Sequence, residues 1–332
     1  MAFKNVGATT LNTMSGASKP YVMDAAGIAS GQAFLTSELE KRDMLVRTPL
    51  TSFTYSRDIP VRVGGGWAEF VSAMNVGYGL TGGSGDGMIG SGSADGIPMV
   101  QADFGKDLWK THAIYAGTRV FWIDMQKGNM TGRNIDTLLR DGLRMAYDKH
   151  MDENVYAGFA KYGTTGIMNN ANVTITSATG NFSALTPDQI LADINNAILT
   201  AWAAAGYDLD AVPNHILLPY QQYNYIATTR VSQIAEKTIL TFLLENNVAK
   251  NYGVDLFIGA TAWCAGAGAG GTDRMVTYCN KERFIAIDEL VPLTRAMTTP
   301  NAERFSYDSA YAGNVSETEV FYPETILYTD GI

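Results

Sequence analysis

The sequence has little charge for its length, and most of that charge is negative. Charged residues make up 17% of the 332 positions, and the formal net charge is −9. Contacts to phosphate groups require clustered Lys and Arg, so the overall field argues against tight nucleic-acid binding and leaves room only for a small basic patch.

Long apolar runs are also missing. No stretch approaches the roughly 18 apolar residues that a membrane helix requires, and the first 20 residues are polar rather than signal-like. We therefore expect a soluble protein with no membrane partner, which stays in the cytoplasm where it is made.

Residue types that carry chemistry are scarce. His112, His150 and His215 are far apart, and none has a second ligand at metal-binding spacing, so we interpret all three as structural. Cys264 and Cys279 have no close-spaced metal motif, and we expect two reduced structural thiols.

Other catalytic patterns are missing or have a local structural explanation. The sequence has no Gly-x-Ser-x-Gly elbow and no Gly-x-x-x-x-Gly-Lys loop. Asp208 and Asp210 flank a turn, and Asp288-Glu289 ends a strand, where acidic side chains make local hydrogen bonds. Gly85–Gly90 matches Gly-x-Gly-x-x-Gly, but inside a glycine-rich loop rather than between a strand and a helix. We predict no catalytic, cofactor-binding or metal-binding residues, and no cofactor.

The clearest regular element is one long amphipathic helix. Its apolar stripe recurs at every fourth position, at Ile135, Leu139, Leu143, Tyr147, Met151 and Val155. Asn134 is the expected N-cap, and Gly158 and Gly163 offer places for the helix to end. About 25 residues at about 1.5 Å each give a rod of nearly 40 Å, on which other elements can be placed.

The region before this helix has the two-residue period of β-strands. Alternation over residues 53–63 and 113–122 predicts strands, separated by a mobile loop at Gly77–Gly96 with nine glycines in twenty positions. Two such segments predict a long hairpin or ribbon. A ribbon buries little by itself, so it needs a neighbour within the chain or from another copy.

Helices and strands interleave after residue 170. Thr186, Pro187 and Gln189 predict a capped helix start, and Ile216–Leu218 a buried strand closed by Pro219, with a further helix beyond. Residues 238–244 are predicted helical; further strands are predicted at residues 173–176, 254–258, 275–278, 284–287, 315–322 and 325–328. This order indicates a mixed α+β class without the regular alternation of a doubly wound sheet.

This order of parts resembles the major capsid proteins of tailed bacteriophages with the Hong Kong 97-like fold, more narrowly a short-tailed subgroup. Asp148 and Asp152, followed by Gly166–Asn169, are similar to the family's junction of an acidic residue, then glycine, an apolar pair and asparagine. Ile216–Pro219, followed by Tyr223, is similar to the strand-then-proline element of the family's axial domain.

The resemblance implies an N-terminal arm (1–50), an extended β-hairpin loop (51–125), a spine helix with part of a peripheral domain (126–180), an axial α/β domain (181–270) and C-terminal strands (271–332). It implies a non-enzymatic shell protein that assembles non-covalently as pentamers and hexamers into an icosahedral head. Separate scaffolding, portal and cement proteins would be its partners, with double-stranded DNA enclosed without tight specific binding. The expected location is the virion, assembled in the cytoplasm of the bacterial host.

Two other interpretations stay open at this point. An encapsulin-like nanocompartment would use the same fold to enclose an enzyme cargo. A cytoplasmic α/β enzyme could assemble its site from dispersed residues such as Asp208, His215 and Tyr220, although the sequence offers no nucleophile–base pair.

Overall fold

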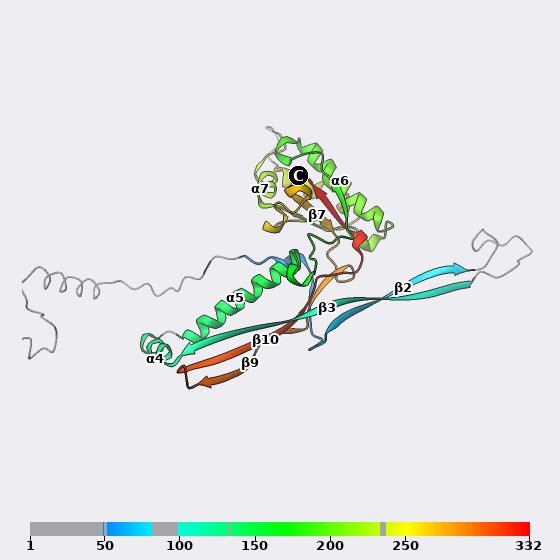
Figure 1. The fold of residues 1–332 in the computed structure, drawn as a ribbon. Helices are drawn as coiled ribbons and strands as arrows, with labels where there is room; N and C mark the ends of the chain where they lie inside the picture. The colour runs from blue at the N-terminus through cyan, green and yellow to red at the C-terminus, as the bar shows by residue number, and fades with distance from the viewer. Residues whose placement is uncertain (1–48, 50–51, 82–98, 133, 233–236) are drawn as a thin grey trace, which may run out of the picture. The chain divides into compact units, whose positions relative to one another are not determined.

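A computed structural model describes residues 49, 52–81, 99–132, 134–232 and 237–332 (Figure 1). The chain divides into two compact units, residues 1–52 and 53–332, and the elements below belong to the second. Among the described residues, no helix is both long and apolar enough to cross a membrane. The predicted arm at residues 1–50, except Pro49, lies outside the described residues. Residues 82–98 of the predicted loop also lie outside them.

The longest strand connects a hairpin to a sheet. Strand β3 (Met99–Phe121) pairs with β2 (Phe70–Thr81) over its first half and with β10 (Ser306–Ser316) over its second. Strand β9 (Val291–Asn301) pairs with the other edge of β10, which gives the antiparallel order β2-β3-β10-β9 (Figure 1). The paired strands β2 and β3 continue past the end of β10 as a two-stranded ribbon.

The long helix α5 (Ile135–Tyr156) packs against β3. Asn134 is its N-cap and accepts a hydrogen bond from the backbone N–H of Thr137, as the sequence predicts. Helix α4 (Trp122–Thr131), which precedes it, ends at Gly132 in the left-handed conformation. Only the second half of α5 is deeply buried. In the first half, the apolar stripe is exposed at Leu139, which keeps 37% of its accessible surface.

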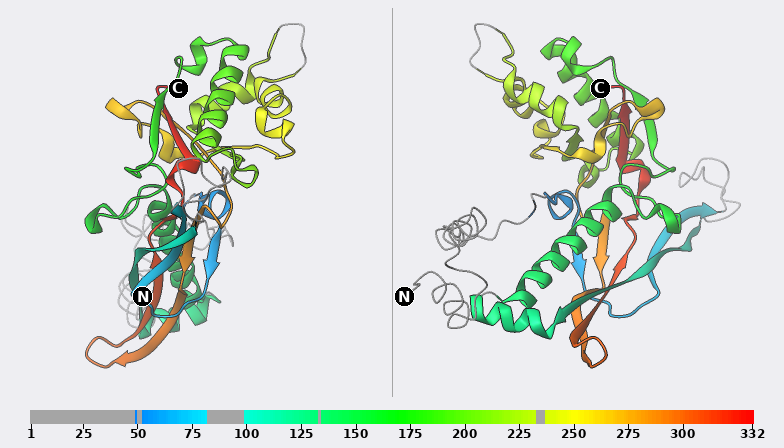
Figure 2. Two further views of the ribbon diagram at one scale, coloured as in Figure 1. Left: turned by 90° about the vertical axis from the view of Figure 1, so that its right-hand side faces the viewer. Right: turned by 60° about the vertical axis from the view of Figure 1, so that its left-hand side comes forward.

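A five-stranded sheet with its helices forms a second region of the unit. Its order is β4-β12-β7-β5-β6, and α6 packs on β7 and β12 while α7 contacts α8 and β6 (Figure 2). The apolar face of α6 is buried at Ile190, Ile194 and Ile198, and its predicted capping box is present at Thr186 and Gln189. The strands of this sheet are β4 (Thr174–Ser177), β5 (His215–Leu218), β6 (Phe257–Ala260), β7 (Arg274–Tyr278) and β12 (Ile326–Asp330). The helices are α6 (Pro187–Ala204), α7 (Tyr220–Thr228), α8 (Ile239–Glu245) and α9 (Val248–Asn251).

A small sheet joins the two larger ones. Strands β1 (Val61–Val63), β8 (Ile285–Glu289) and β11 (Glu319–Val320) form it in the order β1-β8-β11. The chain enters the ribbon after β1, enters β9 after β8, and enters β12 after β11. The three-stranded sheet is therefore the common base of the ribbon, the β9–β10 hairpin and the five-stranded sheet.

The mixed α+β class is confirmed, and so is the long hairpin. The strand predicted over residues 53–63 is wrong in its first part, because Tyr55–Asp58 forms helix α3 and only Val61–Val63 is extended. The loop predicted from Gly77 begins later, because β2 continues to Thr81, and β3 starts at Met99 rather than near 113. Helix α4, strand β9 and most of β10 were not predicted. Helix α5 ends at Tyr156, and Gly158, one of its two predicted end points, follows the C-cap residue Ala157 with φ of 72°.

Candidate assembly surface

The Gly166–Asn169 segment folds back onto the end of α5. Its backbone N–H groups at Ile167 and Met168 donate to the carbonyls of Val155 and Tyr156, at 2.9 and 3.0 Å. A Cβ on Gly166 would lie 2.3 Å from the carbonyl carbon of Tyr156, so only glycine permits this approach. The predicted junction is therefore a close contact that fixes the end of the long helix.

Asn169 completes this contact. Its Oδ1 accepts from the N–H of Gly166 at 2.7 Å, and its Nδ2 donates to the carbonyl of Ala157 at 2.8 Å, just beyond the last turn of α5. The amide thereby satisfies a carbonyl that the end of a helix leaves without an intrahelical partner.

Asp152, on the last turns of α5, holds the start of α3. Its Oδ1 accepts from the backbone N–H groups of Thr54 and Tyr55 at 3.0 and 3.2 Å, and its Oδ2 accepts from the indole Nε1 of Trp263 at 2.7 Å. Thr54 itself makes no side-chain cap, so a residue from a distant helix supplies the acceptor that a local N-cap would normally provide.

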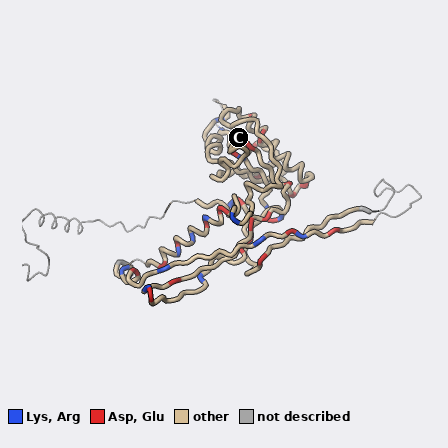
Figure 3. The backbone as a smooth tube through the Cα atoms, viewed as in Figure 1, with Lys and Arg blue, Asp and Glu red and all other residues tan. Residues whose placement is uncertain are grey.

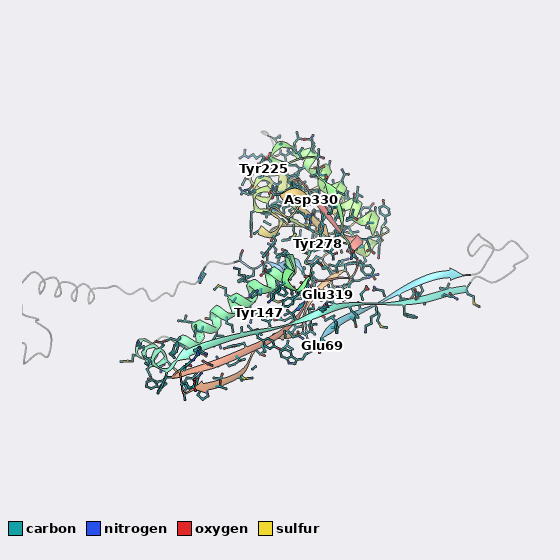
Figure 4. All side chains as sticks on the ribbon, in the orientation of Figure 1. Glu69, Tyr147, Tyr225, Tyr278, Glu319 and Asp330 are labelled. Atoms are coloured by element: carbon teal, nitrogen blue, oxygen red, sulfur yellow. The ribbon has the colours of Figure 1, made fainter. Side chains whose placement is uncertain are left out.

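Asp58 is fully buried at the end of α3 and has several donors around it. Arg57 donates to both of its oxygens, Tyr156 donates to Oδ2, and Nε2 of His215 lies 3.5 Å from Oδ1. The hydroxyl of Tyr278, which Figure 4 labels, donates to the backbone carbonyl of Asp58 at 2.6 Å. Burial raises the pKa of Asp58, but these neighbours outweigh it and hold the pKa below its usual value. This carboxylate anchors the segment that leads into the ribbon.

A second buried acid lies in the three-stranded sheet. Glu319 on β11, labelled in Figure 4, accepts from Arg62 on β1, and the same guanidinium donates to Asp288 on β8. Oε1 of Glu319 is buried and has no hydrogen-bond partner. Burial, together with the nearby charge of Asp288, raises the pKa of Glu319 to about 7. Arg62 thus links β1 to both β8 and β11, through the carboxylates of Asp288 and Glu319.

The ribbon has one strongly apolar face. In an antiparallel pair, directly opposed residues point to the same side, and successive residues alternate. The pairs Phe70–Lys110, Ser72–Leu108, Met74–Lys106, Val76–Phe104 and Tyr78–Ala102 therefore share one face. Its large apolar side chains keep between 42% and 78% of their accessible surface: Phe70, Met74, Val76, Tyr78, Val100, Phe104 and Leu108. We call this the apolar ribbon face.

On the opposite face of the ribbon, the side chains are small or polar in the stretch between the apolar pair Val71–Trp109 and Met99. Opposed pairs there include Ala73–Asp107, Asn75–Gly105 and Gly77–Asp103. β2 itself contains no charged residue, so the acidic groups of this face come from β3 (Figure 3). The two faces differ as the core and solvent faces of a sheet do, yet the apolar one is uncovered within this unit.

The structure keeps the predicted chemistry-bearing residues apart. His150 is exposed on α5, His112 is half-buried on β3, and His215 is buried on β5 beside Asp58. Among the described residues, no group of three or more His, Cys, Asp or Glu side chains could hold a metal ion. Cys264 and Cys279 are both buried free thiols, and burial raises the pKa of Cys279 to about 11.

The acidic residues considered from the sequence have structural partners. Asp208 caps a short 3-10 helix by accepting from the N–H of Asp210, as predicted from the turn, and Asp210 pairs with Lys281 and Arg283. Asp288 binds Arg62, and Glu289 accepts from the hydroxyl of Tyr147 at 2.6 Å, so these two make long-range contacts rather than the local ones predicted.

The dispersed enzyme site is not assembled. His215 begins β5, Tyr220 follows the end of that strand, and the strand separates them. Gly85–Gly90 lies outside the described residues. The buried acids Asp58 and Glu319 were not predicted, because their burial depends on partners distant in the chain, such as Tyr156 for Asp58 and Arg62 for Glu319. The apolar ribbon face was not predicted either, although the alternation of Phe70, Met74, Val76 and Tyr78 could have revealed it.

Comparisons with known proteins agree on one type of molecule. Residues 85–332 match the family model described as major capsid protein. The capsid of Myoviridae phage XM1 superposes with a TM-score of 0.75 at 18% identity, covering 89% of this chain and 98% of that one. The capsid of the native GTA particle gives 0.63 at 11% identity (93% and 99% covered), and a virus-like particle from Pyrococcus furiosus gives 0.51 at 12% (83% and 91%). No curated relative matches the sequence.

Proposed function

Because the chain belongs to the major capsid protein family, we propose that it is the shell subunit of a tailed double-stranded DNA bacteriophage, assembling as pentamers and hexamers into an icosahedral head. The observation that carries this proposal beyond the family is the apolar ribbon face. Seven large apolar side chains are exposed along a two-stranded element that cannot fold stably alone, so they require another surface to cover them.

A neighbouring copy is the cover that shell assembly provides. Repeated copies present the same surface at the same concentration, and many modest contacts can close a shell when each is repeated by symmetry. Lys106 and Lys110 lie on the same ribbon face, which favours a neighbour's surface that combines apolar and acidic groups. The anchoring of the ribbon base through Asp58 and Arg62 would hold this face in a defined direction.

The domain roles follow from the same assignment. We assign the sheet β2-β3-β10-β9 and α5 to a peripheral domain with its extended loop, and the five-stranded sheet with α6 to α8 to an axial domain. Of the segments proposed above, we assign 1–50 to the arm, 51–125 to the extended loop, 126–180 to the spine helix with part of the peripheral domain, and 181–270 to the axial domain. The C-terminal strands of 271–332 are shared by both domains, and the axial sheet also includes β4 from the segment 126–180.

The proposal includes a set of partners and an absence of enzymatic activity. The net charge of −9 suits a wall that encloses DNA without binding it tightly, and separate scaffolding, portal and cement proteins would complete the particle. Assembly would take place in the cytoplasm of the bacterial host. Assignment to the short-tailed subgroup rests on the order of elements alone, and electron microscopy of the virions, which displays the tail, tests it.

An encapsulin-like compartment is the second candidate. The likeness to a virus-like particle from Pyrococcus furiosus favours it, since that assembly shares the fold. The content of the particles separates the two functions. We expect particles purified from infected cells to protect double-stranded DNA from nuclease; particles that instead retain an enzyme and no DNA would establish the compartment.

A further inference from the structure

A strained aromatic residue lies at one end of the peripheral sheet. Phe305 closes the turn between β9 and β10 with φ of 49°, in the left-handed region that bulky residues rarely occupy, and 71% of its surface is exposed. Within the described residues, the only other non-glycine residue with positive φ is Tyr207. The ring of Tyr207 packs on Trp202, whereas no aromatic contact with another described residue accompanies Phe305, so the strain at Phe305 is the one that points to a contact outside the subunit.

The turn that carries Phe305 is firmly held. The carbonyl of Phe305 accepts from the backbone N–H of Trp122 at 2.8 Å, which ties the turn to the start of α4. Asn301 accepts from the N–H of Arg304 at 3.2 Å through its side chain. The ring is thus presented by a fixed backbone, which lowers the entropy that would be lost when it is bound.

A hollow of about 590 Å³ lies nearby, between the α4–α5 turn and the sheet. Val120, Met125 and Ile135 supply its apolar walls, and Asn129, Asp136 and Arg295 are among its polar residues. Phe305 is not among the residues that line it. The volume is within the range of roughly 300–1,000 Å³ typical of sites that accept a ligand or an anchoring side chain.

We infer that Phe305 of one copy inserts into this hollow on a second copy of the chain. Charge supports this occupant: Glu303 and Arg304 precede the ring, and the hollow carries Arg295 and Asp136, paired with each other at 2.9 Å and both partly exposed. The two charges of the turn would extend this partly exposed ion pair across the contact. A central aromatic anchor with a polar surround is the arrangement typical of binding hot spots.

The contact joins two different patches of the same surface, so it is heterologous and closes into a ring about a rotation axis when the angle permits. It rests on the proposed shell function and adds a contact distinct from the ribbon. Each subunit carries both Phe305 and the hollow. In a closed ring of subunits, every subunit therefore inserts one phenylalanine into a neighbour and receives one from the other neighbour.

Phe305→Asn tests the inference, because asparagine tolerates the left-handed conformation and relieves the strain. We expect unfolding of the subunit at the same or higher denaturant concentration than wild type. We also expect the concentration required for particle assembly to rise by at least about tenfold, as for loss of a hot-spot aromatic. Tyr207→Asn is the matched control, since Tyr207 has φ of 59°, is 60% exposed and packs on its own Trp202; it should assemble as wild type does.

A cysteine pair then locates the contact. Phe305→Cys combined with Asn129→Cys should give covalent oligomers on oxidation of assembled particles, whereas each single variant should not, because Cys264 and Cys279 are buried. If wild-type particles form normally, either of two results would overturn this inference and leave the shell function intact. One is normal assembly of Phe305→Asn, and the other is a disulfide confined to single chains. A wild type that forms no particles would contradict both.

Discussion

Asp152 Oδ1 lies 3.0 Å from the backbone nitrogen of Thr54, 98 residues earlier in the chain, and this hydrogen bond ties helix α5 to the start of helix α3. The same carboxylate holds Tyr55 and Trp263. One side chain therefore fixes the approach to the ribbon and the loop after β6 to the long helix. This explains how a two-stranded element with little core of its own has a defined base.

Removal of this carboxylate should destabilise the subunit. Asp152→Ala leaves three buried or half-buried donors without their acceptor, for which we expect a loss of roughly 2–4 kcal/mol in the free energy of unfolding. Urea unfolding of the unassembled subunit measures it. Asp141→Ala, on an exposed position of the same helix, is the control and should change stability by less than about 0.5 kcal/mol. Equal effects of the two substitutions would show that the α3 contact contributes nothing.

Two glycines of this region should respond in opposite directions to alanine. Gly166→Ala forces a methyl group onto the backbone of Tyr156, and we expect a cost of at least about 3 kcal/mol or loss of folding. Gly142→Ala places its methyl group in open space in the middle of α5, so it should stabilise by roughly 0.5–1 kcal/mol. Thermal unfolding of both variants provides the comparison, and a tolerated Gly166→Ala would contradict the close contact described for the junction.

The buried Glu319 should make stability depend on pH near neutrality. Its pKa is raised from 4.5 to about 7, so above pH 7 the charged carboxylate is buried at a cost. As the pH falls from about 7 towards 4.5, the folded state takes up a proton that the unfolded state does not, and the contribution of this group to the free energy of unfolding rises. The expected change is on the order of 3 kcal/mol, at about 1.4 kcal/mol per pH unit.

Glu319→Gln should therefore be more stable than wild type at pH 8, and the difference should shrink towards pH 5. Urea unfolding at several pH values gives this difference directly. Glu324→Gln, at an exposed carboxylate of the same C-terminal region, serves as the control and should follow wild type. A Glu319→Gln curve parallel to that of wild type between pH 8 and 5 would mean that Glu319 does not titrate in this range.

The apolar ribbon face should be needed for assembly and not for folding. Phe104→Glu introduces a charge into the middle of that face, where 69% of the phenylalanine is exposed, so the melting temperature should change by no more than a few degrees. Particle formation should be lost, because a neighbour's apolar surface would have to bury the charge. Gln101→Glu adds the same charge to the opposite face and should assemble. Loss of assembly in both variants would mean that charge alone, and not this face, is responsible.

Shortening the loop Gly82–Gly96 tests the reach of the same element. Because the paired strands end at Thr81 and Met99, a shorter connection leaves their register available and the subunit should remain folded by circular dichroism. We expect particle yield to fall, since the tip of the ribbon would no longer reach its neighbour. Normal particles from the shortened chain would remove the proposed inter-subunit role of this loop.

The sequence predicts elements whose signals are local and misses those that depend on distant residues. Thr186, Pro187 and Gln189 carry the complete signal for the start of α6, and that helix is where it was expected. Strand β9 contains Pro292 and Pro300 and is mostly exposed, so neither alternation nor composition marks it; its pairing with β10 creates it. Helix α3 was interpreted as a strand because its cap, Asp152, comes from another helix.

The candidate surface follows the same division. The alternation along β2 and the absence of catalytic patterns are visible in the sequence. The continuation of β3 from the ribbon into the sheet is not, and neither is the burial of Glu319 beside Arg62 and Asp288, because each results from pairing between segments more than 180 residues apart. The strained Phe305 is visible only in its backbone angle.

Sedimentation velocity of the purified wild-type protein, alone and co-expressed with the proposed scaffolding protein, tests the central claim most directly. Shell formation predicts large closed particles, or rings of five and six copies, in equilibrium with little free subunit. A protein that sediments as a monomer at micromolar concentration in both preparations would contradict the proposed function.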